Sequence, residues 1–344
     1  MKNNPYSLVF GREPSRMIAR LAQTQDICET FLSERPSQQI YMITGVRGSG
    51  KTVMMTEITK RFAKEKNWIV VELNPAKDLL TGLAAKLYHD RFLKHAFRTE
   101  KINLSFFGIG MEIKKTDPVT DIEVALDRML HVIEKQNKRV LIAIDEVANT
   151  QDMRAFASVF QIFVRRDYPL FMLMTGLYEN IDDLQNDKIL TFLHRAPKIR
   201  LSPLNIGSIA NDYGKTFSLE TDDANRMARL TRGYSFAFQV IGHFTWEHGG
   251  DLEKSLPESR QYLEEYVYQK IWSELSAKDK QVLRAAAASE TGAIAGIREE
   301  LQMQTNEFSP YRDRLIKKGV LNGEERGILR FTLPFFEEFV LQQF

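Results

Sequence analysis

The chain has 344 residues, of which 43% are hydrophobic and 27% are charged. This composition is typical of a folded globular protein, and it excludes a largely disordered chain, a collagen-like fibre and a disulfide-rich miniprotein. At about 150 residues per domain, the length predicts two or three domains. The 47 Lys and Arg residues nearly balance the 45 Asp and Glu residues, for a net charge of +2. Binding to nucleic acid or to an acidic membrane would therefore require a local basic patch.

The cysteine count and the apolar patterning point to one compartment. Cys28 is the only cysteine, so the chain forms no internal disulfide, and a reducing cytoplasm is favoured. No apolar stretch reaches the roughly 18 to 20 residues that a membrane span requires. Residues 1–10 lack the apolar centre of a signal peptide. The sequence predicts a cytoplasmic protein with no membrane partner.

Short apolar runs alternate with longer amphipathic stretches between residues 38 and 202. The runs cover residues 39–44, 68–73, 139–144, 170–175 and 198–201, and the helical spacing lies near residues 52–66, 76–98, 119–137 and 151–166. Continuous apolar strands separated by helices are typical of a parallel sheet that is covered on both faces. The sequence predicts an α/β domain over residues 1–202.

One segment of this domain has a different pattern. In residues 101–115, apolar side chains alternate with other residues about Phe107 and Gly108. The alternation predicts a β-hairpin inserted between two helices. A hairpin that covers the domain and one that contacts a partner both fit the pattern.

Beyond residue 203 the strand pattern gives way to helical spacing. Helices are predicted up to residue 272, and three short helical patterns follow between residues 276 and 318. Residues 319–323, which include Asn322 and Gly323, and an apolar run at residues 327–333 come next, and they predict a strand, a turn and a second strand. This order predicts a winged helix-turn-helix over residues 273–344, after a helical region at 203–272.

The strongest motif matches G-x-x-x-x-G-K-[ST]. Its residues are Gly45, Val46, Arg47, Gly48, Ser49, Gly50, Lys51 and Thr52. A predicted strand precedes the motif and a predicted helix follows it, so its backbone N–H groups can surround phosphate oxygens at a helix N-terminus. Lys51 is expected to neutralise the β- and γ-phosphates, and the Thr52 hydroxyl is expected to bind Mg²⁺. The motif predicts a nucleoside triphosphate site.

A pair of carboxylates ends the apolar run at residues 139–144. Asp145 is placed to hold Mg²⁺, directly or through water, and Glu146 to act as the general base on the attacking water. An acidic turn after a strand is common, so this assignment depends on the phosphate loop upstream.

Two further residues are candidates for catalysis. Thr175 ends the run at residues 170–175 and could orient the attacking water, although a plain Thr-Gly turn fits equally. Arg195 precedes the last run and could reach the γ-phosphate of a neighbouring subunit, or simply be solvated.

These four motifs, in this order, resemble the AAA+ and STAND superfamilies of P-loop ATPases. The closer resemblance is to the archaeal ATPase group and the archaeal origin-recognition ATPases, whose opening "GRE" element is similar to Phe10-Gly11-Arg12-Glu13. The resemblance implies a five-stranded parallel sheet, a helical lid and a winged helix. It also implies ATP with Mg²⁺, Thr175 at the sensor 1 position, and Arg195 at the arginine finger.

The resemblance fails at one place. In residues 231–235, the lid motif that reads G-x-P in STAND proteins has Ser235 in place of the proline, and Phe236 stands where origin-recognition ATPases carry a sensor arginine. Arg229 or Arg232 could take over that role, or either could be a solvated helix residue.

The partner of the C-terminal block stays open. Its basic and acidic residues are equal in number from residue 270 onward, although Arg312, Arg314, Lys317 and Lys318 cluster on the expected recognition helix. One interpretation is a Mg²⁺-dependent ATPase that acts on duplex DNA through residues 273–344. Another is a nucleotide-gated switch whose C-terminal domain binds protein, and a third is a protein that holds ADP and hydrolyses almost nothing. A homo-oligomer is compatible with each.

Overall fold

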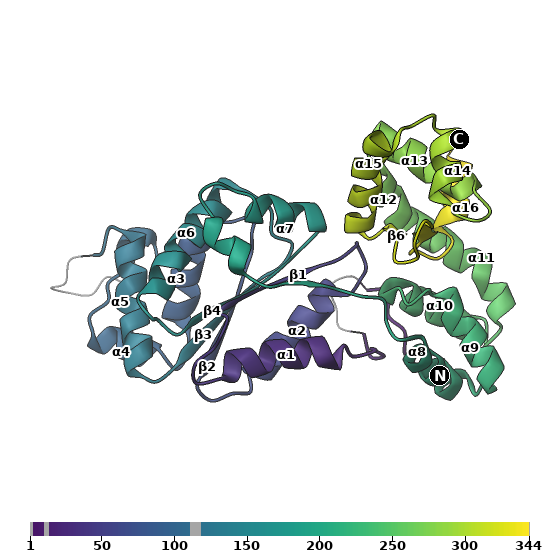
Figure 1. Ribbon diagram of the computed structural model, residues 1–344. Helices are drawn as coiled ribbons and strands as arrows, with labels where there is room; N and C mark the ends of the chain where they lie inside the picture. Colours follow the sequence, from purple (N-terminus) through teal and green to yellow (C-terminus); the bar gives the residue numbers. More distant parts are fainter. Residues whose placement is uncertain (1–2, 10–13, 111–117, 344) are drawn as a thin grey trace. The chain divides into compact units, whose positions relative to one another are not determined.

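The computed structural model of the chain describes residues 3–9, 14–110 and 118–343. The chain forms two units, each with its own hydrophobic core (Figure 1). The first, which we call the sheet unit, contains residues 21–44 and 51–200. The second, the helical unit, contains residues 1–20, 45–50 and 201–344. The phosphate-loop residues 45–50 therefore group with the helical unit, although the residues on both sides of them belong to the sheet unit.

The sheet unit is built on five parallel strands in the order β2-β3-β4-β1-β5. The strands are β1 (Ile40–Thr44), β2 (Trp68–Leu73), β3 (Arg139–Ile144), β4 (Leu170–Gly176) and β5 (Lys198–Arg200). β3 and β4 are buried along almost their whole length, as expected of strands covered on both faces. The predicted α/β fold with a five-stranded parallel sheet is confirmed.

Helices cover both faces of this sheet (Figure 1). The helices of this unit are α1 (Leu21–Leu32), α2 (Lys51–Phe62), α3 (Leu79–His89), α4 (Lys94–Thr99), α5 (Ile122–Lys135), α6 (Gln151–Arg165) and α7 (Tyr178–Gln185), with the 3₁₀ turns η1 (Ser105–Phe107) and η2 (Thr191–Arg195). On the face covered by α1 and α2, Phe31 and Phe62 contact the strand residues Tyr41, Trp68 and Phe171. The other face packs against α3, α5 and α6.

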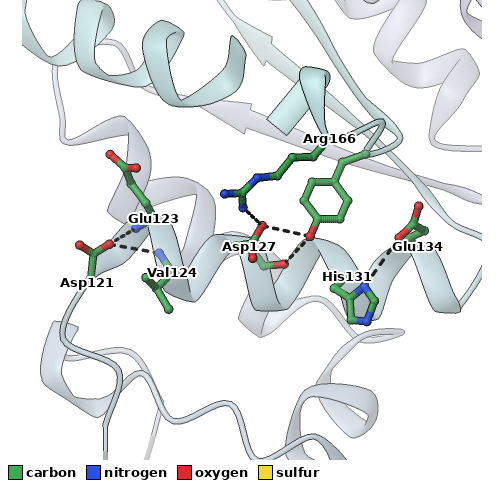
Figure 2. A network of polar contacts seen from close by, with 8 residues as sticks. Asp121, Glu123, Val124, Asp127, His131, Glu134 and Arg166 are labelled. Carbon is green, nitrogen blue, oxygen red and sulfur yellow. Dashed lines mark hydrogen bonds and ion pairs between the residues drawn. The ribbon is translucent and has the colours of Figure 1, made fainter. Parts of the chain in front are cut away.

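Polar contacts fix α5 to the segment between α6 and β4 (Figure 2). Asp121 caps α5 by accepting hydrogen bonds from two backbone N–H groups of its first turn. Further along, Asp127 accepts hydrogen bonds from Arg166 and from the Tyr168 hydroxyl, the latter at 3.0 Å. Burial, together with the bond to Asp127, raises the pKa of Tyr168 to about 12.

The β-hairpin predicted for residues 101–115 is not formed in the described part of that segment, and residues 111–115 lie outside the described residues. The 3₁₀ turn η1 is found instead, and it ends at Gly108 with φ of 69°. Residues 102–104 are all buried, each exposing 2% or less of its surface. Alternation predicts a strand only when neighbouring side chains face opposite environments. Here consecutive side chains enter the core, so the two-residue period was misleading.

The helical unit contains the remaining elements. They are α8 (Ile206–Phe217), α9 (Thr221–Leu230), α10 (Ser235–Glu247), α11 (Leu252–Leu263), the π-turn η3 (Glu264–Tyr268), α12 (Gln269–Ser273), α13 (Ala277–Ala288), α14 (Ile294–Glu300), α15 (Thr305–Lys318), β6 (Leu321–Asn322), β7 (Arg330–Phe331) and α16 (Phe336–Gln342). β6 and β7 pair antiparallel. Three helices followed by an antiparallel pair is the element order predicted for the C-terminal block. Its identity as a winged helix, and the boundaries at residues 203 and 273, stay predictions.

One arginine of the predicted basic cluster joins two helices of this block. Arg314 on α15 donates from Nε (3.0 Å) and Nη2 (2.6 Å) to Asp279 on α13. Asp279 also completes a capping box with Ser276 and is only 2% exposed. The Arg314 guanidinium is therefore paired within this block, while 41% of its side chain stays exposed.

The membrane prediction can be compared with the helices directly. Among the helices within residues 3–9, 14–110 and 118–343, none combines the length and the apolar character needed to cross a membrane.

Candidate nucleotide-binding site

The two predicted metal ligands lie together in the sheet unit. Asp145 follows β3, and Thr52 lies in the first turn of α2. Thr52 Oγ1 donates a hydrogen bond to Asp145 Oδ2 at 2.8 Å. A hydroxyl and a carboxylate oxygen in contact form a donor set of the kind that Mg²⁺ uses, with waters and substrate phosphates completing its shell.

Thr175 holds both acidic residues in place. It is completely buried at the end of β4, which lies beside β3 in the sheet. Its hydroxyl donates to Asp145 Oδ1 and accepts a hydrogen bond from the Glu146 N–H at 3.1 Å. Thr175 therefore fixes the orientation of the Asp145 carboxylate and of the peptide that leads into Glu146.

Glu146 adopts a backbone conformation that most residues avoid. Its φ is 55°, in the left-handed region, where a side chain other than glycine is uncommon. The side chain is exposed, and its carboxylate makes no hydrogen bond or ion pair within the described residues. The carboxylate is therefore accessible to a water molecule.

Two glycines of the phosphate loop, Gly48 and Gly50, have positive φ, in the left-handed region that favours glycine. A Cβ on Gly48, whose φ is 71°, would lie 2.2 Å from the Tyr234 hydroxyl. A Cβ on Gly45 would lie 2.6 Å from Ser49 Oγ. Ser49 Oγ is itself buried and has no hydrogen-bond partner in the part of the chain that the structure describes. A buried hydroxyl without a partner beside close-packed backbone fits a loop that binds an anionic ligand.

Three consecutive residues at the start of α10 donate hydrogen bonds to three consecutive carbonyl groups of this loop. The bonds run from Tyr234 Oη to the Arg47 oxygen (2.6 Å), from the Phe236 N–H to the Gly48 oxygen (3.1 Å), and from Ser235 Oγ to the Ser49 oxygen (2.9 Å). In addition, the Arg47 guanidinium pairs with Glu274 at 2.7 Å. Sequence reasoning missed these contacts, because a bond to a backbone carbonyl requires no particular residue type in the loop.

The arginines considered as substitutes for the missing sensor lie elsewhere. Arg232 Nη1 donates to the carbonyl oxygens of Phe331 (3.0 Å) and Leu333 (3.2 Å), and its guanidinium pairs with Glu337. Arg232 is therefore bound to the segment that follows β7. Arg229 is exposed near the end of α9 and has no hydrogen bond or ion pair within the described residues.

The other predicted residues lie at the end of a helix or outside the described residues. Lys51 begins α2 and is 9% exposed. Arg195 ends η2 and is exposed, without a hydrogen bond or ion pair among residues 14–110 and 118–343. The segment Phe10-Gly11-Arg12-Glu13 lies outside the described residues.

Residues 26–167 match the model of an ATPase domain found predominantly in Archaea. The chain resembles the AAA+ and STAND type of P-loop ATPase, as its sequence predicts. Residues 265–340 match a second model, described as a domain of unknown function (DUF8462). No curated protein sequence matches the chain.

Solved structures share the fold over nearly the whole length. A Walker-type ATPase of Pyrococcus abyssi is 15% identical, with 95% of this chain and 96% of that chain covered and a TM-score of 0.66. The ORC2 protein of Aeropyrum pernix, solved as ADPNP–ADP complexes, is 13% identical, with 97% of each chain covered and a TM-score of 0.61. Its ADP form is 14% identical, again with 97% of each chain covered, and has a TM-score of 0.52. At these identities the likeness concerns the fold.

Proposed function

We propose that this chain binds ATP with Mg²⁺ and hydrolyses it to ADP and phosphate. The observation that carries the proposal is the Asp145 carboxylate, which is bonded to Thr52 on one oxygen and to Thr175 on the other, beside the exposed Glu146. A relative with the same fold was solved with ADPNP and ADP, which supports a nucleotide as the ligand. The choice of ATP over GTP rests on the family resemblance and on the absence of an N-K-x-D motif from the sequence.

The phosphate loop and α2 would hold the triphosphate. Backbone N–H groups of the loop, among them those of Gly48 and Gly50, and the Lys51 ammonium would bind phosphate oxygens, while Thr52 and Asp145 would provide oxygen ligands to the metal. Once bound, Mg²⁺ neutralises charge on the β- and γ-phosphates.

Glu146 is assigned to the attacking water. Its carboxylate accepts a proton from that water as the water oxygen attacks the γ-phosphorus, and the bond from γ-phosphorus to the bridging oxygen breaks to release ADP. Thr175 keeps Asp145 and the Glu146 peptide oriented during this step. Arg195 is exposed, so it can reach a second copy of the chain. In such an oligomer its guanidinium would stabilise charge on the neighbour's γ-phosphate.

Steady-state ATP turnover tests this assignment. The wild type is compared with Glu146→Gln, which keeps the shape of the side chain but cannot accept the proton. Glu123→Gln is the matched control, because Glu123 is an exposed carboxylate on α5. Turnover should fall about 10²- to 10⁴-fold in Glu146→Gln and stay unchanged in the control. No turnover in the wild type, even at high protein concentration, would contradict hydrolysis and leave a protein that only holds nucleotide.

We further propose that the C-terminal block acts on a protein and that the nucleotide state controls this contact. Two members of the basic cluster on α15 are less available than the sequence suggests. Arg314 is bonded to Asp279, and Lys318 is half-buried. DNA-binding proteins depend on cations that can reach the phosphates. The reduced cluster therefore favours the protein-directed switch over the DNA-directed ATPase.

Duplex DNA added to the turnover assay at about 100 mM salt separates these two classes. The switch predicts no change in turnover and no binding of labelled duplex. DNA-stimulated turnover that disappears in Glu146→Gln would contradict the switch and favour the DNA-directed enzyme.

A further inference from the structure

The geometry of the peptide group links the α10 contacts to phosphate binding. In a planar trans peptide, the carbonyl oxygen of one residue and the N–H of the next point in opposite directions. The carbonyls of Arg47, Gly48 and Ser49 are all bonded to residues at the start of α10. The N–H groups that follow them must therefore point away from α10, into the loop.

The three N–H groups behave as this geometry requires. The N–H of Ser49 closes a turn within the loop by donating to the Val46 carbonyl at 3.2 Å. The N–H groups of Gly48 and Gly50 have no acceptor within the described residues. Two unpaired donors beside the partnerless Ser49 hydroxyl leave the inner side of the loop ready for an anion.

We propose that Tyr234, Ser235 and the Phe236 N–H position the phosphate-binding N–H groups of Gly48 and Gly50, in place of the sensor arginine that the chain lacks. This inference rests on the proposed nucleotide site and names the residues that set its affinity. Residues 234–236 act as positioning residues, since they contact the outer side of the loop and leave the inner side to the ligand. Displacement of α10 from the loop would free the three carbonyls and lower the affinity for phosphate.

The surroundings of Tyr234 and Ser235 determine that each hydroxyl is the donor in its hydrogen bond to the loop. The Tyr234 ring is buried, and burial raises the pKa of its phenol, so Tyr234 stays a donor throughout the neutral range. The Ser235 hydroxyl accepts a hydrogen bond from Arg20 Nη2 at 3.3 Å, which directs its own proton to the Ser49 carbonyl. Burial lowers the pKa of Arg20 only to about 10, so that donor also stays charged.

Equilibrium binding of ADP·Mg²⁺ and of inorganic pyrophosphate, well below the melting temperature, tests the proposal. Tyr234→Phe removes only the hydroxyl and leaves the Arg47 carbonyl without its donor. Tyr262→Phe is the matched control, because Tyr262 is a half-buried tyrosine of α11 whose hydroxyl makes no hydrogen bond in the described residues. Lys51→Ala reports on the phosphate site itself. Ser235→Ala serves as a second variant that keeps the Tyr234 packing.

The expected result is that Tyr234→Phe weakens both ligands about tenfold, as expected when a partly buried carbonyl loses its hydrogen bond. Ser235→Ala should weaken them similarly, and Tyr262→Phe should bind like the wild type. Equal losses for ADP and pyrophosphate place the effect on phosphate contacts. A lower melting temperature with unchanged affinity in Tyr234→Phe and Ser235→Ala would mean a purely structural role and overturn the inference alone. Equal loss in Tyr262→Phe would also overturn it. If the wild type binds neither ligand and Lys51→Ala changes nothing, the proposed function itself fails.

Discussion

Substitution of Gly48 by alanine tests the fit between the phosphate loop and α10. The new Cβ would lie 2.2 Å from Tyr234 Oη and 2.9 Å from Phe236 Cβ. An L-residue in the left-handed region costs about 1–2 kcal/mol, and overpacking against the buried Tyr234 side chain adds about 1–3 kcal/mol. Gly48→Ala should therefore lower the free energy of unfolding of the helical unit by about 2–5 kcal/mol.

Gly249→Ala is the matched control for this experiment. Gly249 lies in the same unit with φ of 65°, and a Cβ there would meet no atom within 4 Å. Only the backbone cost of about 1–2 kcal/mol applies to it. The difference between the two variants therefore isolates the contact with Tyr234 and Phe236.

Urea unfolding followed by tryptophan fluorescence measures both variants. Of the three tryptophans, Trp246 and Trp272 lie in the helical unit, so a Trp68→Phe background reports on that unit alone. Equal midpoints for Gly48→Ala and Gly249→Ala would refute the reasoning. Combining Gly48→Ala with Tyr234→Phe removes the closest atom, so the double variant should lose less than the sum of the single losses.

Three other predictions follow from single side chains. Thr175→Val removes the hydroxyl that orients Asp145, so the Mg²⁺ concentration for half-maximal nucleotide binding should rise about 10- to 100-fold. Thr175→Ser keeps a hydroxyl and should bind nucleotide at the wild-type Mg²⁺ concentration. An unchanged Mg²⁺ titration in Thr175→Val would contradict the role assigned to Thr175. Arg314→Leu leaves the buried Asp279 carboxylate without its cation, so unfolding in urea should show a loss of about 1–3 kcal/mol. The double variant Arg314→Leu with Asp279→Asn should lose less free energy of unfolding than Arg314→Leu alone. An equal or larger loss in the double variant would count against the Arg314–Asp279 pairing. Cys28 is completely buried, and burial raises its thiol pKa. At pH 8 a thiol reagent should therefore modify Cys28 far more slowly in the folded protein than in urea. Equal modification rates would mean that α1 opens readily.

The strands of the sheet and the phosphate loop could both be predicted from the sequence alone. Apolar runs of five to seven residues have few alternatives to buried parallel strands, so β3 and β4 were predictable from local composition. The loop at residues 45–52 was predictable because its chemistry depends on glycines and a lysine at fixed spacing within one short segment. Alternation at residues 101–115 was a wrong indication of a hairpin, since a two-residue period does not show whether both sets of side chains are buried.

The tertiary structure alone decided how those parts are held. The Thr175 hydroxyl reaches Asp145 and Glu146 because β4 lies beside β3 in the sheet. The order of strands in a sheet is set by the whole fold, so it could not be predicted from the local sequence. The sequence places Arg314 in a basic cluster, whereas in the structure its guanidinium pairs with Asp279. The bonds from residues 234–236 to the loop carbonyls had no sequence signal at all. Every residue carries the same backbone carbonyl group, so the identity of a residue does not show whether its carbonyl accepts a hydrogen bond. Only the tertiary structure shows which carbonyls lie next to a donor.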